Sequence, residues 1–218
     1  MSLLSDPTRL AGLVTREVRT GSRDGVPTRI AVARRSYQTD PADLWDALTN
    51  PERIPRWFLP ISGRLEVGGR YQLEGHANGV IERCDAPKAL AATWEWDGKV
   101  SWMEVGLTPV NDGTQLELTH EVPFEPEMWG RFGPGAVGVG WDLTLAGLGS
   151  YLSSGEAVDP KEGQHVHRTP EGRVFIRASV TGWGEAAIAD GDEPATAQTA
   201  ADAAYSFYTT EPDSRPES

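Results

Sequence analysis

Residues 40–60 constrain the fold of this chain most, because they place one short helix and an aromatic pair between strand-like segments. Asp40 is a good helix N-cap, and the proline after it suits the first helical position, where its missing N–H costs nothing. An Asn-Pro pair at 50–51 ends the helix, since a residue before proline avoids helical angles. A short turn then delivers Trp57 and Phe58 to the next strand. Two large aromatic side chains on a connecting segment predict that they cover a hollow.

Short apolar-alternating segments fill residues 13–122, and Gly-, Asn- and Asp-rich gaps separate them, which is typical of antiparallel hairpins. The first hairpin is expected to turn at Gly21–Gly25. In the last strand, alternation assigns Leu116, Leu118 and His120 to one face. The pattern therefore predicts antiparallel pairing with one apolar face. The expected strands span residues 13–20, 27–37, 64–67, 70–74, 80–85, 90–96, 102–107 and 115–122.

From about residue 136 the apolar period becomes helical. Trp141, Leu145, Leu148 and Leu152 follow one another at spacings of four, three and four residues, which is a full core-facing stripe. Gly155 is the expected end, because glycine is the usual residue after a helix. Several glycines inside this helix each lower its intrinsic stability by about 1 kcal/mol relative to alanine. Close packing on a curved sheet would offset that cost.

Matching residues accompany this order of elements: Thr39–Trp45, Leu48–Pro51, Trp57-Phe58, Gly68–Tyr71, Pro87, Leu90, Thr93-Trp94, Gly113-Thr114, Leu116, Leu118, His120, Gly140-Trp141, Leu148 and Leu152. With these residues, the chain resembles the helix-grip fold of the START-like superfamily. Within that superfamily the chain is similar to the family related to the C-terminal domain of the Hsp90 ATPase activator. The resemblance covers about residues 26–154 and implies an α+β fold, in which a curved antiparallel sheet wraps around a long C-terminal helix.

Three parts of the chain are therefore expected: an N-terminal extension with an edge strand (1–25), the helix-grip domain (26–154) and an acidic, alanine-rich helical tail (155–218). Thr169 followed by Pro-Glu is a helix start, and Phe175, Ser179, Trp183 and Ala186 then share a stripe. A second helix is expected over residues 195–208. These helices are too weakly apolar to fold alone, so they should dock on the domain or on the second subunit of a homodimer.

Charge and composition exclude several classes of function. The formal net charge of −12 disfavours binding to nucleic acids, which requires cations against phosphates. A membrane span needs about 20 apolar residues, and the nearest candidate, residues 132–155, contains Asp142 and many glycines. The single cysteine, Cys84, cannot form an internal disulfide, and no secretory signal is visible at the start. A cytoplasmic protein without nucleic-acid or membrane partners is therefore expected.

No motif predicts a cofactor, a metal or a catalytic residue. Gly133–Gly138 matches G-x-G-x-x-G, but a dinucleotide site needs a preceding parallel strand, whereas antiparallel strands and a loop over 126–132 are expected here. The motif is better explained as a flexible beginning of the long helix. His165 and His167 lie in a polar loop without a third ligand, which makes a poor zinc site.

The remaining signal is a set of aromatic residues. Each one taken singly is better explained as core, but as a set they favour the lining of a cavity between the sheet and the long helix. His120 and Tyr71 are candidate polar anchors, and for His120 the alternative is a core histidine bonded to a neighbour. His76 is expected to be exposed. The predicted ligand-binding residues are Trp57, Phe58, Tyr71, Trp94, Trp96, His120, Phe124, Trp129, Phe132, Trp141 and Leu145.

Three functions remain open at this level. The favoured one is a binding protein for a small apolar or aromatic ligand. A cyclase- or dehydratase-like enzyme acting on a polyketide-like ligand would need at least two convergent titratable groups, and the sequence offers one inward candidate, His120. A protein-interaction role is suggested by the Hsp90-activator resemblance, and it would need an exposed apolar patch.

Overall fold

The computed structural model describes residues 4–158 and 165–210. In these ranges eight strands form one antiparallel sheet in the order β1-β2-β8-β7-β6-β5-β4-β3. The strands are β1 (Thr15–Arg23), β2 (Val26–Tyr37), β3 (Ile61–Gly63), β4 (Arg70–Leu73), β5 (Asn78–Asp85), β6 (Ala89–Trp96), β7 (Lys99–Val110) and β8 (Gly113–Pro123). The helices are α1 (Pro7–Gly12), α2 (Pro41–Thr49), α3 (Pro126–Phe132), α4 (Gly135–Ser154), α6 (Pro170–Asp190) and α7 (Pro194–Thr209), with 3₁₀ turns η1 (Ile54–Arg56) and η2 (Val166–Arg168).

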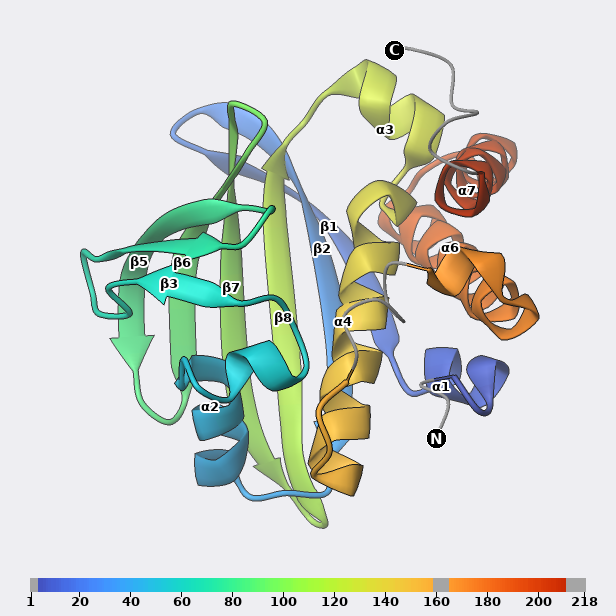
Figure 1. Cartoon of the computed structure of the whole chain (residues 1–218). Coiled ribbons are helices and arrows are strands. Elements are labelled where there is room, and N and C mark those ends of the chain that lie inside the picture. The colour runs from blue at the N-terminus through green and yellow to red at the C-terminus, as the bar shows by residue number, and fades with distance from the viewer. Residues whose placement is uncertain (1–3, 159–164, 211–218) are drawn as a thin grey trace.

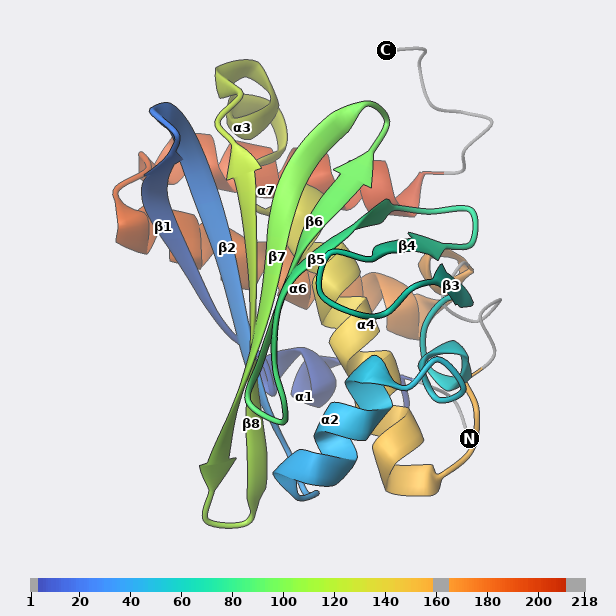
Figure 2. The same ribbon diagram turned by 90° about the vertical axis from the view of Figure 1, so that its left-hand side faces the viewer.

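The molecule has three layers. The twisted sheet forms one layer, the long helix α4 crosses it, and the pair α6 and α7 covers the far side of α4 (Figure 1). A view turned by a quarter turn about the vertical axis shows α2 beside α4, and both helices pack on the inner face of the strands (Figure 2). The expected α+β fold, a curved antiparallel sheet around a long helix, is confirmed.

Helix α4 is buried on two sides. Its sheet-facing side carries the predicted stripe, in which Trp141, Leu145 and Leu148 are buried. The opposite side carries Val139 and Ala146, which belong to a second core cluster shared with α6. A helix that is apolar around its circumference is covered by other elements, and here the tail supplies the second cover.

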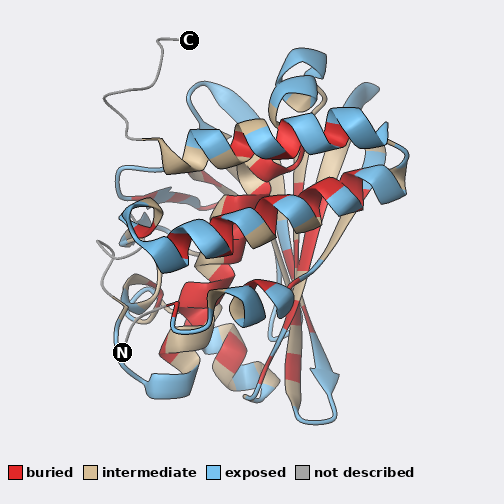
Figure 3. Cartoon of the chain, turned by 90° about the vertical axis from the view of Figure 1, so that its right-hand side faces the viewer, coloured by how far each residue is buried: buried red, intermediate tan, exposed pale blue. Residues whose placement is uncertain are grey.

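The tail forms a helical hairpin whose apolar stripes face inward (Figure 3). Phe175, Ser179, Trp183 and Ala186 of the predicted α6 stripe are all buried. Helix α6 contacts β1, which lies at the edge of the sheet, and it also contacts α1 and α4. Since these contacts join residues far apart in sequence, the tail is packed on the same body as the sheet. The proposed division into residues 1–25, 26–154 and 155–218 stays a prediction.

One buried carboxylate joins the tail to the rest of the protein. Oδ2 of Asp142 in α4 accepts hydrogen bonds from Arg16 Nε at 2.8 Å, from the Ser179 hydroxyl, and from Trp183 Nε1 at 3.2 Å. The Asp142 side chain is fully buried, and that of Arg16 is 8% exposed. Loss of hydration on burial raises the pKa of Asp142, against the opposing effect of the Arg16 charge. We call these four residues the Asp142 cluster.

Local hydrogen bonds explain where the helices begin. The Asp40 carboxylate accepts from the backbone N–H groups of Ala42 and Asp43, both at 2.9 Å, and so caps α2 as expected. The Thr169 hydroxyl accepts from the N–H of Gly172 at 3.0 Å and starts α6. These interactions involve only neighbours in sequence, which is why the sequence predicts them.

Three local expectations are corrected, and one helix is added. The strand predicted at 64–67 is wrong: β3 lies at Ile61–Gly63, and the chain then turns so tightly that a Cβ on Gly69 would overlap the Arg64 carbonyl oxygen. The loop expected over 126–132 is the helix α3, with its proline at the first helical position. The first hairpin turns at Asp24 and Gly25 alone, both with positive φ, so its strands run longer than expected. Helix α1 was not predicted.

Candidate ligand-binding cavity

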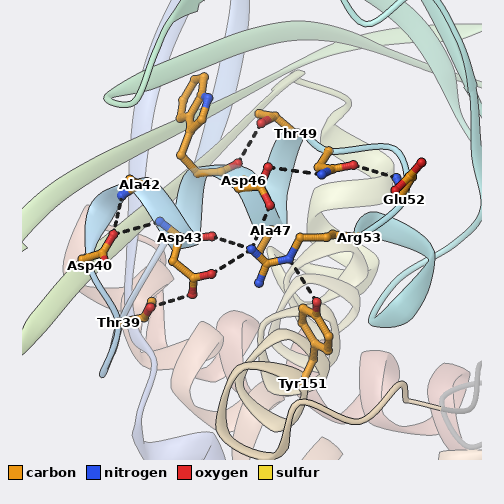
Figure 4. Close-up of polar contacts among 12 residues, drawn as sticks. Thr39, Asp40, Ala42, Asp43, Asp46, Ala47, Thr49, Glu52, Arg53 and Tyr151 are labelled. Atoms are coloured by element: carbon orange, nitrogen blue, oxygen red, sulfur yellow. Dashed lines mark hydrogen bonds and ion pairs between the residues drawn. The ribbon is translucent and has the colours of Figure 1, made fainter.

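An arginine anchors the segment that carries the aromatic pair. Arg53 Nη1 donates to Asp43 Oδ1 at 2.8 Å and to Asp46 Oδ2 at 2.9 Å, and its Nε donates to the Tyr151 hydroxyl at 3.0 Å (Figure 4). These bonds tie η1 to α2 on one side and to the end of α4 on the other. They raise the pKa of Arg53, against the opposing effect of its partial burial.

Trp57 and Phe58 follow directly after this anchor. Trp57 Nε1 donates to the Ala47 carbonyl oxygen at 3.0 Å and thereby satisfies one of the last carbonyls of α2. The rings of Trp57 and Phe58 stack with their centroids 5.7 Å apart. The aromatic pair is therefore held in one orientation, and it covers a hollow between the sheet, α2 and α4, as the sequence predicts.

The hollow consists of two chambers. An inner chamber of about 150 Å³ lies between α2, α4 and strands β4 to β8. An outer chamber of about 490 Å³ lies between the first turns of α4, the tips of β6 and of the β4–β5 turn, and the end of α7. The residues that line both chambers, and so form the wall between them, are Trp57, Phe58, Trp94, Trp141 and Thr144.

The inner chamber is lined almost entirely by apolar side chains. Its walls include Leu65, Ile81, Met103, Leu118 and Leu145. A cavity of about 150 Å³ with such a lining stays free of water and can hold a single benzene ring. The inner chamber therefore favours an apolar group of about that size.

His120 lies in the wall of the outer chamber, and protein groups bind both of its ring nitrogens. Nδ1 accepts from Trp141 Nε1 at 2.9 Å, and Nε2 lies 2.8 Å from the Ser101 hydroxyl. That hydroxyl donates to the Trp94 carbonyl oxygen at 3.0 Å, so it accepts from His120, whose proton is on Nε2. Burial lowers the pKa of His120 to about 4. The ring is therefore neutral at pH 7 and belongs to a closed network, which matches the core-histidine alternative.

We expect this network to make stability fall in weak acid. The folded-state pKa of His120, about 4, lies below the ordinary value of 6.5, so the unfolded chain binds the proton more readily. The stability that the neutral His120 ring contributes to the fold is thus fully present above pH 6.5. It is lost as the pH falls from 6.5 towards about 4. Urea midpoints of wild type and His120→Gln, measured at about pH 7 and about pH 4.5, should show the smaller acid decrease in the variant. Equal decreases of the urea midpoint in the two proteins would contradict this prediction.

The structure brings together eight of the eleven predicted ligand-binding residues. Tyr71 and Leu145 line the inner chamber. Trp96 and His120 line the outer chamber. The other four, Trp57, Phe58, Trp94 and Trp141, line both. That any of them binds a ligand stays a prediction.

Three predicted residues lie elsewhere, so for them the cavity prediction is wrong. The rings of Phe124 and Trp129 hold the guanidinium of Arg29, at 5.0 and 4.9 Å from their centroids. Phe132 packs against Phe207, with ring centroids 5.5 Å apart. The expected 126–132 loop is instead the helix α3, which packs against α7. Phe124 precedes this helix and lies with Trp129 over Arg29 of β2, while the indole N–H of Trp129 donates to Asp192 Oδ2 at 2.7 Å.

The sequence interpretation missed three polar side chains of the outer chamber. His76 is exposed, as expected, but it also lines the chamber and stacks on Trp96 with ring centroids 4.7 Å apart. Thr144 and Tyr208 lie in its wall too. In the sequence Tyr208 is identifiable only as a member of the α7 stripe, and no local pattern connects it with the other residues of the chamber, which lie between positions 57 and 158.

In residues 4–158 and 165–210, no three His, Cys, Asp or Glu side chains are grouped so that they could hold a metal ion. Within the same ranges, every helix falls short of the length or the apolar character that crossing a bilayer requires.

Comparison with known proteins identifies the family. The profile of the family described as Activator of Hsp90 ATPase homolog 1-like protein matches residues 38–153. The crystal structure of CalU16 from Micromonospora echinospora is 30% identical over 79% of this chain and 97% of that chain, with a TM-score of 0.63. Its solution structure is 29% identical over 82% of this chain and 97% of that chain, with a TM-score of 0.68.

A third structure shares the fold alone. DynU16, a protein of the dynemicin biosynthetic locus, is 19% identical over 59% of this chain and 48% of that chain, with a TM-score of 0.52. The search among curated proteins found no match. On the profile match and the likeness to CalU16, this chain belongs to the family of Activator of Hsp90 ATPase homolog 1-like proteins.

Proposed function

We propose that the protein binds a small apolar or aromatic molecule in the two chambers between the sheet and α4. The observation that carries this proposal is the outer chamber of about 490 Å³, whose wall includes Trp57, Trp94, Trp96 and Trp141. Ligand pockets in proteins typically measure about 300–1,000 Å³ and combine apolar walls with few polar groups. The inner chamber extends this apolar surface behind the same aromatic residues.

The two alternatives have less support. A cyclase or dehydratase needs a group that is free to exchange a proton with its substrate. The inward histidine, His120, uses both ring nitrogens within the protein, and its pKa is lowered to about 4. The co-chaperone role rests on the description of the family. A location in the cytoplasm remains part of the proposal.

A matched pair of substitutions tests the cavity. Thr144 lines both chambers, and its hydroxyl donates to the carbonyl oxygen four residues earlier, at 2.9 Å. Thr199 makes the same kind of bond at 2.8 Å on the exposed face of α7. Thr144→Phe places a phenyl ring in the shared wall, so it should weaken binding of the fluorescent dye Nile red at least about tenfold, a loss of about 1.4 kcal/mol. Thr199→Phe should leave the dye affinity unchanged.

Nile red titrations of both variants and of wild type give the affinities. An equal affinity in Thr144→Phe and wild type would place the dye outside the chambers and would contradict the proposal. Native mass spectrometry of the purified protein adds an independent measurement. A co-purified molecule present in wild type and in Thr199→Phe, but absent from Thr144→Phe, is the expected result.

A further inference from the structure

We infer that the ligand carries a hydrogen-bond acceptor, such as a carbonyl oxygen, which binds at the end of the outer chamber formed by His76, Trp94 and Trp96. This inference rests on the proposed function and adds the chemistry of the ligand to it. It follows from which polar groups in the two chambers already have partners, because a ligand that covers a polar group without bonding to it removes that group from water at a cost in free energy.

The hydroxyl groups of the inner chamber are already used as donors. Thr49 donates to the Trp45 carbonyl oxygen at 2.8 Å, and Tyr71 donates to that of Thr93 at 2.7 Å. Thr144, in the shared wall, donates to the backbone as described above. The part of a ligand that enters the inner chamber therefore meets no free hydroxyl donor, which favours an unsubstituted ring there.

Most polar groups of the outer chamber are used as well. The indole N–H of Trp57 is bonded to Ala47, and that of Trp141 is bonded to His120. The Tyr208 hydroxyl donates to the Ala136 carbonyl oxygen at 2.9 Å and ties the end of α7 to the start of α4. None of these protons is available to a ligand without breaking a bond within the protein.

Three side chains of the outer chamber have polar atoms that are not bonded within the described part of the protein. In the part of the chain that the structure describes, the ring nitrogens of His76 and the indole N–H groups of Trp94 and Trp96 have no hydrogen-bond partner in the protein, and the side chains of His76 and Trp96 are exposed. The three rings are neighbours: His76 stacks on Trp96 and meets Trp94 edge-on, with centroids 5.6 Å apart. They form one polar end in an otherwise apolar chamber.

The chemistry of this end selects an acceptor. An indole N–H can only donate, so Trp94 and Trp96 cannot accept a hydrogen bond from a ligand through this group. His76 can donate from one ring nitrogen in its neutral form. The turn between β4 and β5 holds His76 in place, since its backbone N–H donates to Leu73 at 3.0 Å and its carbonyl accepts from Gln72 at 2.9 Å. A flat aromatic ketone fits the stacked rings and the donors together.

Fluorenone and fluorene test the inference, because they share one ring system and differ by a carbonyl group. We expect wild type to bind fluorenone more tightly than fluorene by about two- to tenfold, the value of one hydrogen bond. His76→Phe keeps a flat ring against Trp96 and removes the nitrogens, so it should weaken fluorenone binding by about the same factor and change fluorene binding less than about twofold. Trp102→Phe, on the outer face of the sheet beside Arg23, is the control and should change neither affinity.

The carbonyl stretch of bound fluorenone gives a second readout that needs no variant. Its infrared band should move to lower frequency in wild type, as hydrogen bonding to a carbonyl requires, and move back in His76→Phe. Equal affinities of wild type for the two compounds, or an unshifted carbonyl band, would overturn this inference and leave the proposed function standing. If neither compound binds wild type, both the proposed function and the inference fail.

Discussion

Replacing Arg16 by methionine is expected to destabilise the protein by about 3–5 kcal/mol near neutral pH, because it leaves a buried carboxylate without its cation. The side chain of Asp142 is fully buried, and Arg16 is the one charged partner in the Asp142 cluster. Arg16 also donates to the carbonyl oxygens of Ala11 and Val14, at 2.9 and 3.1 Å, so the variant loses contacts to the segment around α1 as well. Urea denaturation at constant pH measures the difference.

A matched variant in the same strand separates burial from charge. Arg19 pairs with Glu17, but the two side chains are 44% and 40% exposed. An exposed pair contributes about 0–1 kcal/mol, so Arg19→Met should change stability by no more than that. Similar losses in Arg16→Met and Arg19→Met would show that the Asp142 cluster does not hold the tail in the way proposed here.

The effect of Arg16→Met should also depend on pH in a defined direction. Burial raises the folded-state pKa of Asp142 above its ordinary value of 3.8, and removing Arg16 removes an interaction that lowers it. A carboxyl group with a raised pKa stabilises the fold fully below its unfolded-state pKa, and this contribution is lost as the pH rises through the folded-state pKa. The difference between Arg16→Met and wild type should therefore shrink as the pH is lowered towards 4. A difference that grows in acid would contradict this assignment.

Replacing either of two glycines in α4 by alanine should change the stability of the protein, in opposite directions at the two positions. A Cβ on Gly138 would overlap the indole ring of Trp183, which is rigid, buried and bonded to Asp142. Gly138→Ala must displace that ring, so we expect a loss of about 2–4 kcal/mol. A Cβ on Gly140 would meet only the Tyr208 hydroxyl, at an ordinary contact distance of 3.6 Å. Gly140→Ala should therefore stabilise the protein by about 0.5–1 kcal/mol through its higher helix propensity.

Thermal and urea unfolding of the two variants give both signs in one experiment. The comparison is internal, because the same methyl group is added two residues apart in one helix. A stabilising Gly138→Ala would show that Trp183 does not occupy the notch at that position. A destabilising Gly140→Ala would show that this face of α4 is packed more tightly than the chamber of about 490 Å³ allows.

Helix α4 forms a wall of the chambers on one side and the packing surface for the tail on the other. One side of the helix holds the tail through Gly138 and Asp142, and the other side lines the chambers through Gly140, Trp141 and Thr144. The tail returns to the chamber at Tyr208, whose hydroxyl is bonded to the first turn of α4. Changes in tail packing are therefore expected to reach the outer chamber through α4 itself.

The sequence determined those features that depend on neighbours along the chain. The helix caps at Asp40 and Thr169 involve residues two or three positions away, so the sequence alone predicts them. Alternation correctly placed Leu116, Leu118 and His120 on the inner face, because side chains alternate along any strand. The stripe of α4 predicted which of its sides faces the sheet.

Only the tertiary structure decided what each side chain meets. Alternation predicts that His120 points inward, but it does not predict its partners. Ser101 from another strand and Trp141 from α4 bind its two ring nitrogens. Likewise Trp129 is as aromatic as Trp94, yet α3 directs it to Arg29 rather than to the chambers. The periodicity of one element predicts only which way its side chains point. A site is formed by side chains from several elements, and no local pattern contains the relative positions of those elements.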